Sequence, residues 1–241
     1  MAAVLPATTP LSHIREEELK AAISTVTEVD SSDSEAEFEH APSYDLSASH
    51  LITSPYPDFA NQTRLTDLSL SCRLLSFALT NMAPIRPDYS TADYMESFNW
   101  NVCFAELRKL CAQTGYRWQR QEFYVVIFRS KLKLGADRTR LGELDQHSHA
   151  EACQSGGLLK YWFGECNGER RNLATCLWRG RDDAIAGGKG PWHAKAMRSA
   201  VEMYETISFH RHSLIIEDGA EGWSLEEYSG PGVRRASRAG H

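Results

Sequence analysis

The sequence lacks the features that mark membrane, secreted and nucleic-acid-binding proteins. No apolar run reaches the roughly 18 residues that a membrane span needs. The N-terminus shows no charged segment followed by an apolar core, so no signal peptide is expected. A net charge of −6 gives no electrostatic reason to expect nucleic acid. These absences favour a cytoplasmic protein without membrane or nucleic-acid partners.

Common metal and catalytic motifs are also missing. The 6 cysteines have no CxxC spacing, which favours free structural thiols over a zinc site or a disulfide framework, and no metal is expected. GxSxG, HExxH and GxGxxG do not occur, which removes the commonest hydrolase, zincin and dinucleotide-binding classes. The stretch 187–190 (GGKG) lacks the spacing of a phosphate-binding loop. A lid or a substrate-contacting loop is the better functional interpretation of it.

Composition divides the chain into two tails and one domain. Residues 1–64 are predicted to form a largely disordered acidic arm, because residues 28–39 mix acids with serines and carry few apolar groups. Residues 230–241 are predicted to form a disordered basic tail. The remaining residues, 65–229, are predicted to form one α+β domain with its core in 121–228.

Hydrophobic patterns predict the order strand, helix, strand, strand, helix, strand. The predicted strands are 123–128, 158–164, 172–178 and 206–216, and the predicted helices are 137–153 and 184–204. A helix over 98–112 precedes them, and the apolar region 68–79 fits either a strand or a helix. This order predicts a ferredoxin-like antiparallel sheet with helices on one face. The other face would be covered by a second copy, giving a homodimer, or by the N-terminal elements.

The predicted strands carry many aromatic side chains, which fit either a packed core or an apolar pocket for a flat small molecule. Arginine and asparagine at the hairpin turn could hold a substrate oxygen, or they could form a solvated tip. On the pocket interpretation, the candidate substrate-binding residues are Tyr124, Phe128, Tyr161, Trp162, Arg171, Asn172, Trp178 and Trp192.

Histidines supply the candidate catalytic groups. His193 lies in a predicted helix and could be a general base or a ligand, or it could simply bond across the helix–sheet junction. His147 and His149 are two residues apart on a helix and therefore diverge. His210 and His212 share one face of a strand and could bind a metal, although no acidic partner is evident nearby.

Several of these motifs resemble known families. The stretches 155–164 (SGGLLKYWFG), 171–178 (RNLATCLW) and 193–196 (HAKA) resemble a fungal family of uncharacterised proteins, over roughly residues 95 to 228. More distantly, Trp178, residues 181–184 and residues 191–193 are similar to the dimeric α/β-barrel superfamily. That superfamily includes antibiotic-biosynthesis monooxygenases, haem-degrading oxygenases and polyketide-tailoring enzymes. The haem-degrading members imply an iron ligand at His193.

Three functions from different classes follow. The first is a tailoring enzyme, in the secondary metabolism of a fungus, acting on a flat, polyketide-like substrate. It would need no bound cofactor, would use His193 as acid or base, and would be an oxygenase, cyclase or dehydratase. The second is a haem-binding oxygenase. The third is a non-catalytic scaffold whose acidic arm meets a partner. The sequence favours the first.

Overall fold

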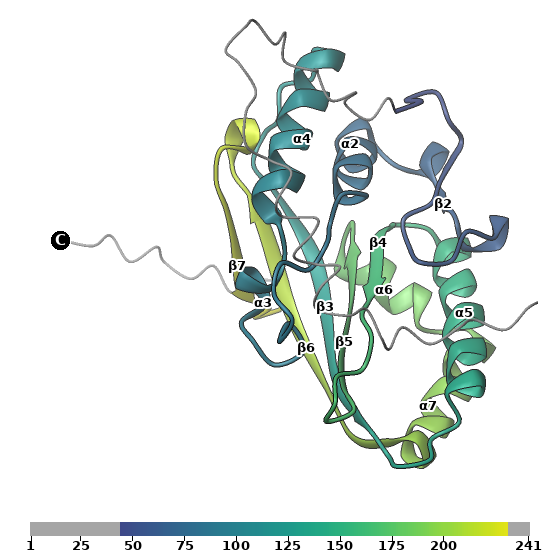
Figure 1. Ribbon diagram of the computed structural model, residues 1–241. Coiled ribbons are helices and arrows are strands. Elements are labelled where there is room, and N and C mark those ends of the chain that lie inside the picture. The colour runs from purple at the N-terminus through teal and green to yellow at the C-terminus, as the bar shows by residue number, and fades with distance from the viewer. Residues whose placement is uncertain (1–43, 231–241) are drawn as a thin grey trace, which may run out of the picture. The chain divides into compact units, whose positions relative to one another are not determined.

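Helices pack on both faces of a five-stranded antiparallel sheet in the computed structural model, which describes residues 44–230 (Figure 1). The strands lie in the order β4-β5-β3-β6-β7. From residue 121 onward the elements are β3 (Gln121–Leu132), α5 (Arg138–Ser155), β4 (Leu158–Phe163), β5 (Arg171–Trp178), α6 (Arg181–Gly187), α7 (Pro191–Met203), β6 (Tyr204–Ile216), η3 (Asp218–Ala220) and β7 (Trp223–Glu227).

The order of strands and helices from β3 to β6 is that of a ferredoxin-like fold, which confirms the predicted fold class. β3 lies at the centre, paired antiparallel with β5 on one side and β6 on the other. Its dense β-branched and aromatic sequence, from Phe123 to Phe128, suits a strand that is covered on both faces. β7, which the sequence did not predict, extends the sheet beyond β6.

The N-terminal half of the chain covers one face of this sheet. It contains β1 (His50–Leu51), η1 (Phe59–Asn61), β2 (Thr63–Arg64), η2 (Leu65–Asp67), α2 (Leu70–Leu79), α3 (Tyr94–Ser97) and α4 (Trp100–Thr114). Residues of α2 and α4 share a core with Phe123, Val125 and Ile127, which alternate along β3 and are at most 2% exposed. The chain's own helices therefore occupy the face that a second copy would have to cover. A homodimer through another surface stays a prediction.

Two predicted boundaries are wrong. The helix expected over 184–204 is two helices, α6 and α7, because the chain breaks at the glycines before Pro191, which occupies the first turn of α7. The domain also begins earlier than residue 65: Thr53, Asn61 and Thr63 are 0, 2 and 3% exposed. The residues 50–64, called the N-terminal segment below, lie along α5 (Figure 1). The rest of the predicted arm and tail, 1–43 and 231–241, lies outside the described residues.

Among the described residues, no helix is both long and apolar enough to cross a bilayer.

Candidate functional site

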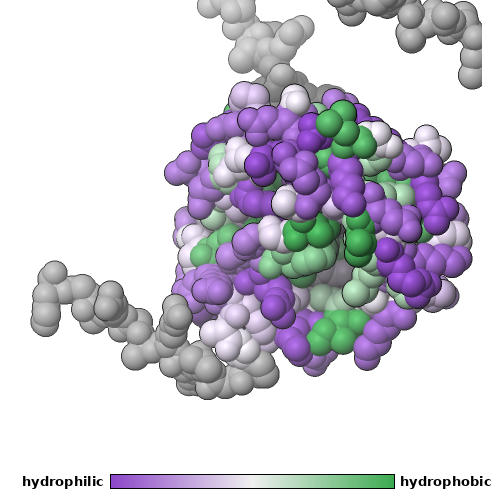
Figure 2. Space-filling model, turned by 90° about the horizontal axis from the view of Figure 1, so that it is seen from below, coloured by the Kyte–Doolittle hydropathy of each residue, from purple (hydrophilic) through white to green (hydrophobic). Residues whose placement is uncertain are grey.

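The sheet face under α5 and α7 is incompletely covered. Five neighbouring positions on this face are only half-buried, although helices lie above them; they are Val126, Phe128, Tyr161, Phe163 and Ala174. On the opposite face Leu173 and Leu177 are fully buried. Figure 2 shows hydrophobic residues gathered around a hollow at the end of the molecule that is seen from below. We call the half-buried surface that these five side chains form, between the sheet and the helices α5 and α7, the interlayer hollow.

A carboxyl group from α5 is held at this face by two tyrosines. The hydroxyl of Tyr161, on β4, donates to one oxygen of Asp145 over 2.7 Å, and the hydroxyl of Tyr56, on the N-terminal segment, donates to the other over 2.5 Å. Phe163 completes the aromatic surroundings, with its ring centroid 5.7 Å from that of Tyr56. We call Asp145, Tyr56 and Tyr161 the carboxyl clamp.

Burial changes the acidity of all three groups in the clamp. Burial raises the pKa of Asp145, even though both hydrogen bonds and the nearby His193 act to lower it. Burial, followed by the charge of Asp145, raises the pKa of both Tyr56 and Tyr161. The phenols therefore stay protonated donors, while the carboxyl group is more easily protonated than one in water. Such a carboxyl is typical of general acid–base sites.

His149 lies one helical turn after Asp145 and is 5% exposed. Its Nδ1 is 2.8 Å from the amide nitrogen of Asn61, and its ring centroid lies 5.1 Å from that of Tyr161. Burial, and to a smaller extent the charge of His193, lowers the pKa of His149 to about 4, so the ring is neutral at physiological pH. With Nδ1 accepting from the Asn61 amide, this neutral ring helps to hold the N-terminal segment on α5.

His193, the predicted catalytic residue, lies at the start of α7 with its side chain about one quarter exposed. Its Nδ1 is 3.2 Å from Oε2 of Glu151, and the same oxygen accepts the backbone N–H of His193 over 3.1 Å. The other oxygen of Glu151, Oε1, accepts the backbone N–H of Trp192 over 2.7 Å. Burial acts to raise the pKa of Glu151, but these contacts outweigh it and leave the pKa below its usual value. Glu151 thereby serves as the missing cap of α7, whose own N-cap is Gly190.

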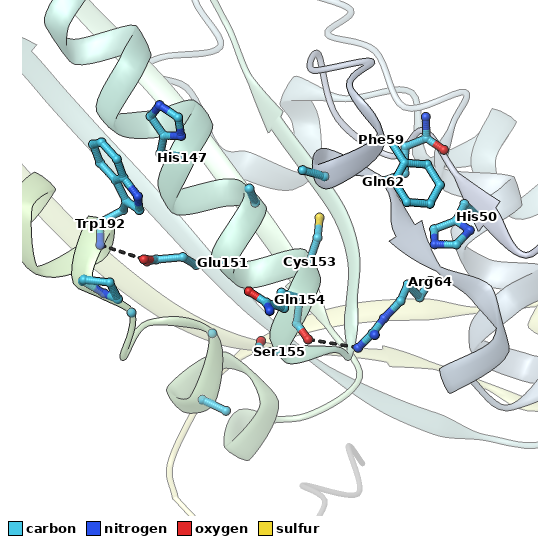
Figure 3. Close-up of a pocket in the computed structure, with 16 residues that line it drawn as sticks. His50, Phe59, Gln62, Arg64, His147, Glu151, Cys153, Gln154, Ser155 and Trp192 are labelled. Carbon is cyan, nitrogen blue, oxygen red and sulfur yellow. Dashed lines mark hydrogen bonds between the residues drawn. The ribbon is translucent and has the colours of Figure 1, made fainter.

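A second depression lies on the other side of α5 (Figure 3). This outer groove of about 760 Å³ is bounded by the N-terminal segment, the outward side of α5 and the α6–α7 junction. Glu151 and Trp192 line it on one side, and Phe59 lines it on the other. Arg64 lies at one end, where it donates to the carbonyl of Gln154 over 3.0 Å.

The structure brings only some of the predicted substrate-binding residues together. Phe128 and Tyr161 lie at the interlayer hollow, whereas Tyr124 and Trp178 are buried in the core on the same face of the sheet. Trp162 points to the opposite face, where its ring meets Phe98 and Tyr89 at 4.9 and 5.3 Å.

The others lie elsewhere. Arg171 pairs with Glu169 at the hairpin turn, and the side chain of Asn172 accepts the N–H of Leu173. Trp192 lies in the outer groove, stacked on His147 with ring centroids 4.0 Å apart. His147 and His149 do diverge, as the helical spacing predicts.

Sequence reasoning missed Asp145, Tyr56 and His149. One signal was present: Asp145 and His149 are four residues apart on a helix, which places both on one face. Nothing local could have identified Tyr56, because it lies 89 positions from its partner in the chain. Within residues 44–230, no cluster of three or more His, Cys, Asp or Glu side chains is arranged to hold a metal ion.

Comparisons with known proteins give a family and distant structural neighbours. Residues 52–227 match the model of a family described as PB2B2.08-like. The chain is 30% identical over 192 residues to UPF0643 protein PB2B2.08 of the fission yeast Schizosaccharomyces pombe, covering 73% of this chain and 84% of that one. This match agrees with the resemblance to a fungal family that the motifs indicate.

Solved structures match over little of the chain. A putative antibiotic biosynthesis monooxygenase from Nitrosomonas europaea is 14% identical with a TM-score of 0.33, covering 36% of this chain and 94% of that one. SnoaB, a cofactor-independent oxygenase from Streptomyces nogalater, is 9% identical with a TM-score of 0.33, covering 38% and 91%.

Proposed function

The chain belongs to the PB2B2.08-like family, and because that description names no reaction, we propose its function from its own site. We propose a small-molecule tailoring enzyme that binds a flat, largely apolar substrate in the interlayer hollow and moves a proton with Asp145 and His193. The observation that carries this proposal is the carboxyl clamp. It combines a carboxyl group of raised pKa, two phenol donors and a half-buried apolar surface.

The clamp supplies the parts that proton-transfer chemistry needs. Asp145 can take a proton from an acidic carbon or hydroxyl group of the substrate, or return one when it is protonated. The hydroxyl groups of Tyr56 and Tyr161 stay protonated and could turn to a substrate oxygen that gains negative charge. Phe128 and Phe163 would provide the flat apolar surface against which the rings of the substrate lie.

His193 is the second proton-transfer group in this proposal. A charge on His193 lowers the pKa of Asp145. Glu151 fixes the ring through Nδ1 and so defines its orientation. Proton transfer of this kind serves a cyclase, a dehydratase or a cofactor-independent oxygenase. The substrate class that we propose is a polyketide-like molecule of fungal secondary metabolism.

Haem binding is the second candidate at this site. The contact of His193 Nδ1 with Glu151 leaves Nε2 as the nitrogen that would hold an iron, which would then supply oxygen chemistry. The proton transfer proposed above needs no haem, and no step is derived through it. Titration of the purified chain with haem is expected to give no Soret band. A band that disappears in His193→Ala would support the haem-binding oxygenase instead.

The test is binding and turnover of a planar polycyclic polyketide such as an anthraquinone. Asp145→Asn keeps the shape of the side chain but removes its proton chemistry, so turnover should fall roughly 100-fold or more with little change in binding. His193→Ala should lower turnover at least about tenfold. The matched control is Glu143→Gln, an exposed carboxyl on the same helix, which should leave turnover unchanged.

Two outcomes would reject the proposal. One is saturable binding and turnover that survive both Asp145→Asn and His193→Ala at the level of the Glu143→Gln control. The other is the absence of saturable binding by any planar polycyclic probe in a folded protein. Thermal melts of each variant, read by circular dichroism, separate loss of chemistry from loss of fold.

A further inference from the structure

The outer groove lies on the other side of α5 from the interlayer hollow, and the carboxyl clamp does not line it. α5 stands between the two: Asp145 is directed toward β4, where it meets Tyr161, whereas His147, Glu151 and Gln154 line the groove. The groove volume of about 760 Å³ lies within the usual range for small-molecule sites, roughly 300 to 1,000 Å³.

Aromatic rings form both walls of the groove. On one wall the rings of His50 and Phe59 have centroids 4.5 Å apart, and Phe59 is 71% exposed. On the other wall His147 stacks on Trp192 at an interplanar angle of 19°. Phe59 therefore keeps most of its ring surface free at the rim of the cavity, and flat walls of this kind suit a flat guest.

Glu151 provides one remaining hydrogen-bond acceptor in the groove. A carboxylate offers about four lone-pair positions. One oxygen accepts the N–H of Trp192, and the other accepts both the backbone N–H and the ring of His193. The first oxygen therefore keeps one free position. Because the pKa of Glu151 is lowered, this oxygen carries negative charge and would attract an N–H or O–H donor.

Two glycines in the groove lining are required by close packing. A side chain at Gly190 would collide with the carboxyl group of Glu151, and one at Gly187 would collide with the ring of Trp178. Both glycines line the groove, where they replace side chains with bare backbone. Gly187 and Gly190 are thus explained by packing, which is a role that the sequence alone did not suggest.

We propose that the outer groove is a binding site for a planar heteroaromatic molecule that carries an N–H donor. The rings of the guest would lie between Phe59 and Trp192, and its N–H group would donate to the free position on Glu151. This site shares Glu151 with the proposed reaction, in which Glu151 orients His193, but none of its named residues belongs to the carboxyl clamp.

The experiment compares two probes that differ only in the donor, carbazole and 9-methylcarbazole. Carbazole should bind the full chain saturably, as measured by probe fluorescence. 9-Methylcarbazole should bind at least about tenfold more weakly, because one charge-assisted hydrogen bond is lost. Phe59→Ala should weaken carbazole binding at least about tenfold through the lost stacking contact. Since Phe59 is 71% exposed, this variant should fold normally. Leu134→Ala, at an 85% exposed leucine outside the groove, is the matched control and should bind carbazole like the natural chain.

Three results would overturn this assignment. They are no saturable carbazole binding, equal binding of the two probes, and binding that Phe59→Ala leaves unchanged. Phe128→Ala distinguishes the two sites, because Phe128 belongs to the apolar surface of the interlayer hollow and not to the groove. Carbazole binding that is lost in Phe128→Ala but kept in Phe59→Ala would place the probe in the interlayer hollow and would leave the proposed reaction standing without this second site.

Discussion

His149 should make the stability of the fold depend on pH. Its pKa is lowered to about 4 by burial and by His193, whereas an unfolded chain keeps a value of about 6.5. The unfolded chain therefore binds the proton more tightly between these values. The stabilising contribution is complete above pH 6.5 and is lost as the pH falls toward 4, by up to roughly 3 kcal/mol.

Urea unfolding at pH 7 and pH 4.5 measures this effect. The natural chain should lose more unfolding free energy over this range than His149→Gln, which lacks the titrating group. His147→Gln, at the exposed histidine two residues earlier, should follow the natural chain. The raised pKa of Asp145 acts in the opposite direction in all three proteins, so it cancels in the comparison. Equal pH dependence in His149→Gln and the natural chain would show that the buried imidazole does not control stability.

At the residue scale, the aromatic content of the strands predicted part of the interlayer hollow. Phe128 and Tyr161 were chosen because they are aromatic residues of predicted strands, and both lie at the interlayer hollow. Aromatic content could not tell a half-buried position from a packed one, so Tyr124 and Trp178 were chosen with them. The carboxyl clamp escaped prediction because it joins residues that are far apart in the chain.

At the scale of elements, the junction between α6 and α7 depends on Gly190. Its backbone angles, φ −71° and ψ 161°, are open to any residue, so conformational freedom is not the reason for the glycine. An added methyl group would instead displace Glu151 and free the N–H groups of Trp192 and His193. Gly190→Ala should therefore lower the unfolding free energy by roughly 1 to 3 kcal/mol.

The matched control lies two residues away. A methyl group at Gly188 would make only ordinary contacts, with the nearest atom 3.5 Å away, and its φ of −82° suits alanine. Gly188→Ala should be neutral, or should stabilise the fold by up to about 1 kcal/mol through the unfolded chain. Denaturant titration of both variants decides the matter. If Gly190→Ala is as stable as Gly188→Ala, the cap by Glu151 does not contribute measurably.

The elements themselves were largely predictable, and the failures have physical reasons. Helices 98–112 and 137–153 and the four strands were found because their periodicity is strong. The break in 184–204 was missed because apolar spacing continues across it, although three glycines and a proline were there to read. The segment 68–79 fitted two structures from periodicity alone, and its helix, α2, is settled by packing against α4.

For the whole molecule, the order of the strands followed from the sequence, but the partner of the second sheet face did not. A hydrophobic face must be covered, and either a second copy or the N-terminal half could cover it. The choice depends on tertiary contacts between elements that are far apart in the chain, such as the core shared by Leu75, Leu107 and Val125. No local pattern encodes such contacts.

This covering makes a prediction about which part of the chain can fold alone. Residues 120–230 keep the whole sheet but lose α2 and α4. Their removal would expose eight side chains that are at most 2% exposed, namely Phe123, Val125, Ile127, Leu159, Leu173, Leu177, Leu214 and Ile216. At roughly 1.5 to 3 kcal/mol each, the loss is about 12 to 24 kcal/mol, which matches or exceeds the roughly 5 to 15 kcal/mol that typically stabilises a domain. Residues 120–230 should therefore form no folded monomer, whereas residues 44–230 should melt cooperatively. Size-exclusion chromatography with light scattering and thermal melts of both chains make the measurement. A monomer of residues 120–230 that unfolds cooperatively would show that the N-terminal helices are an addition to the fold and not a part of its core.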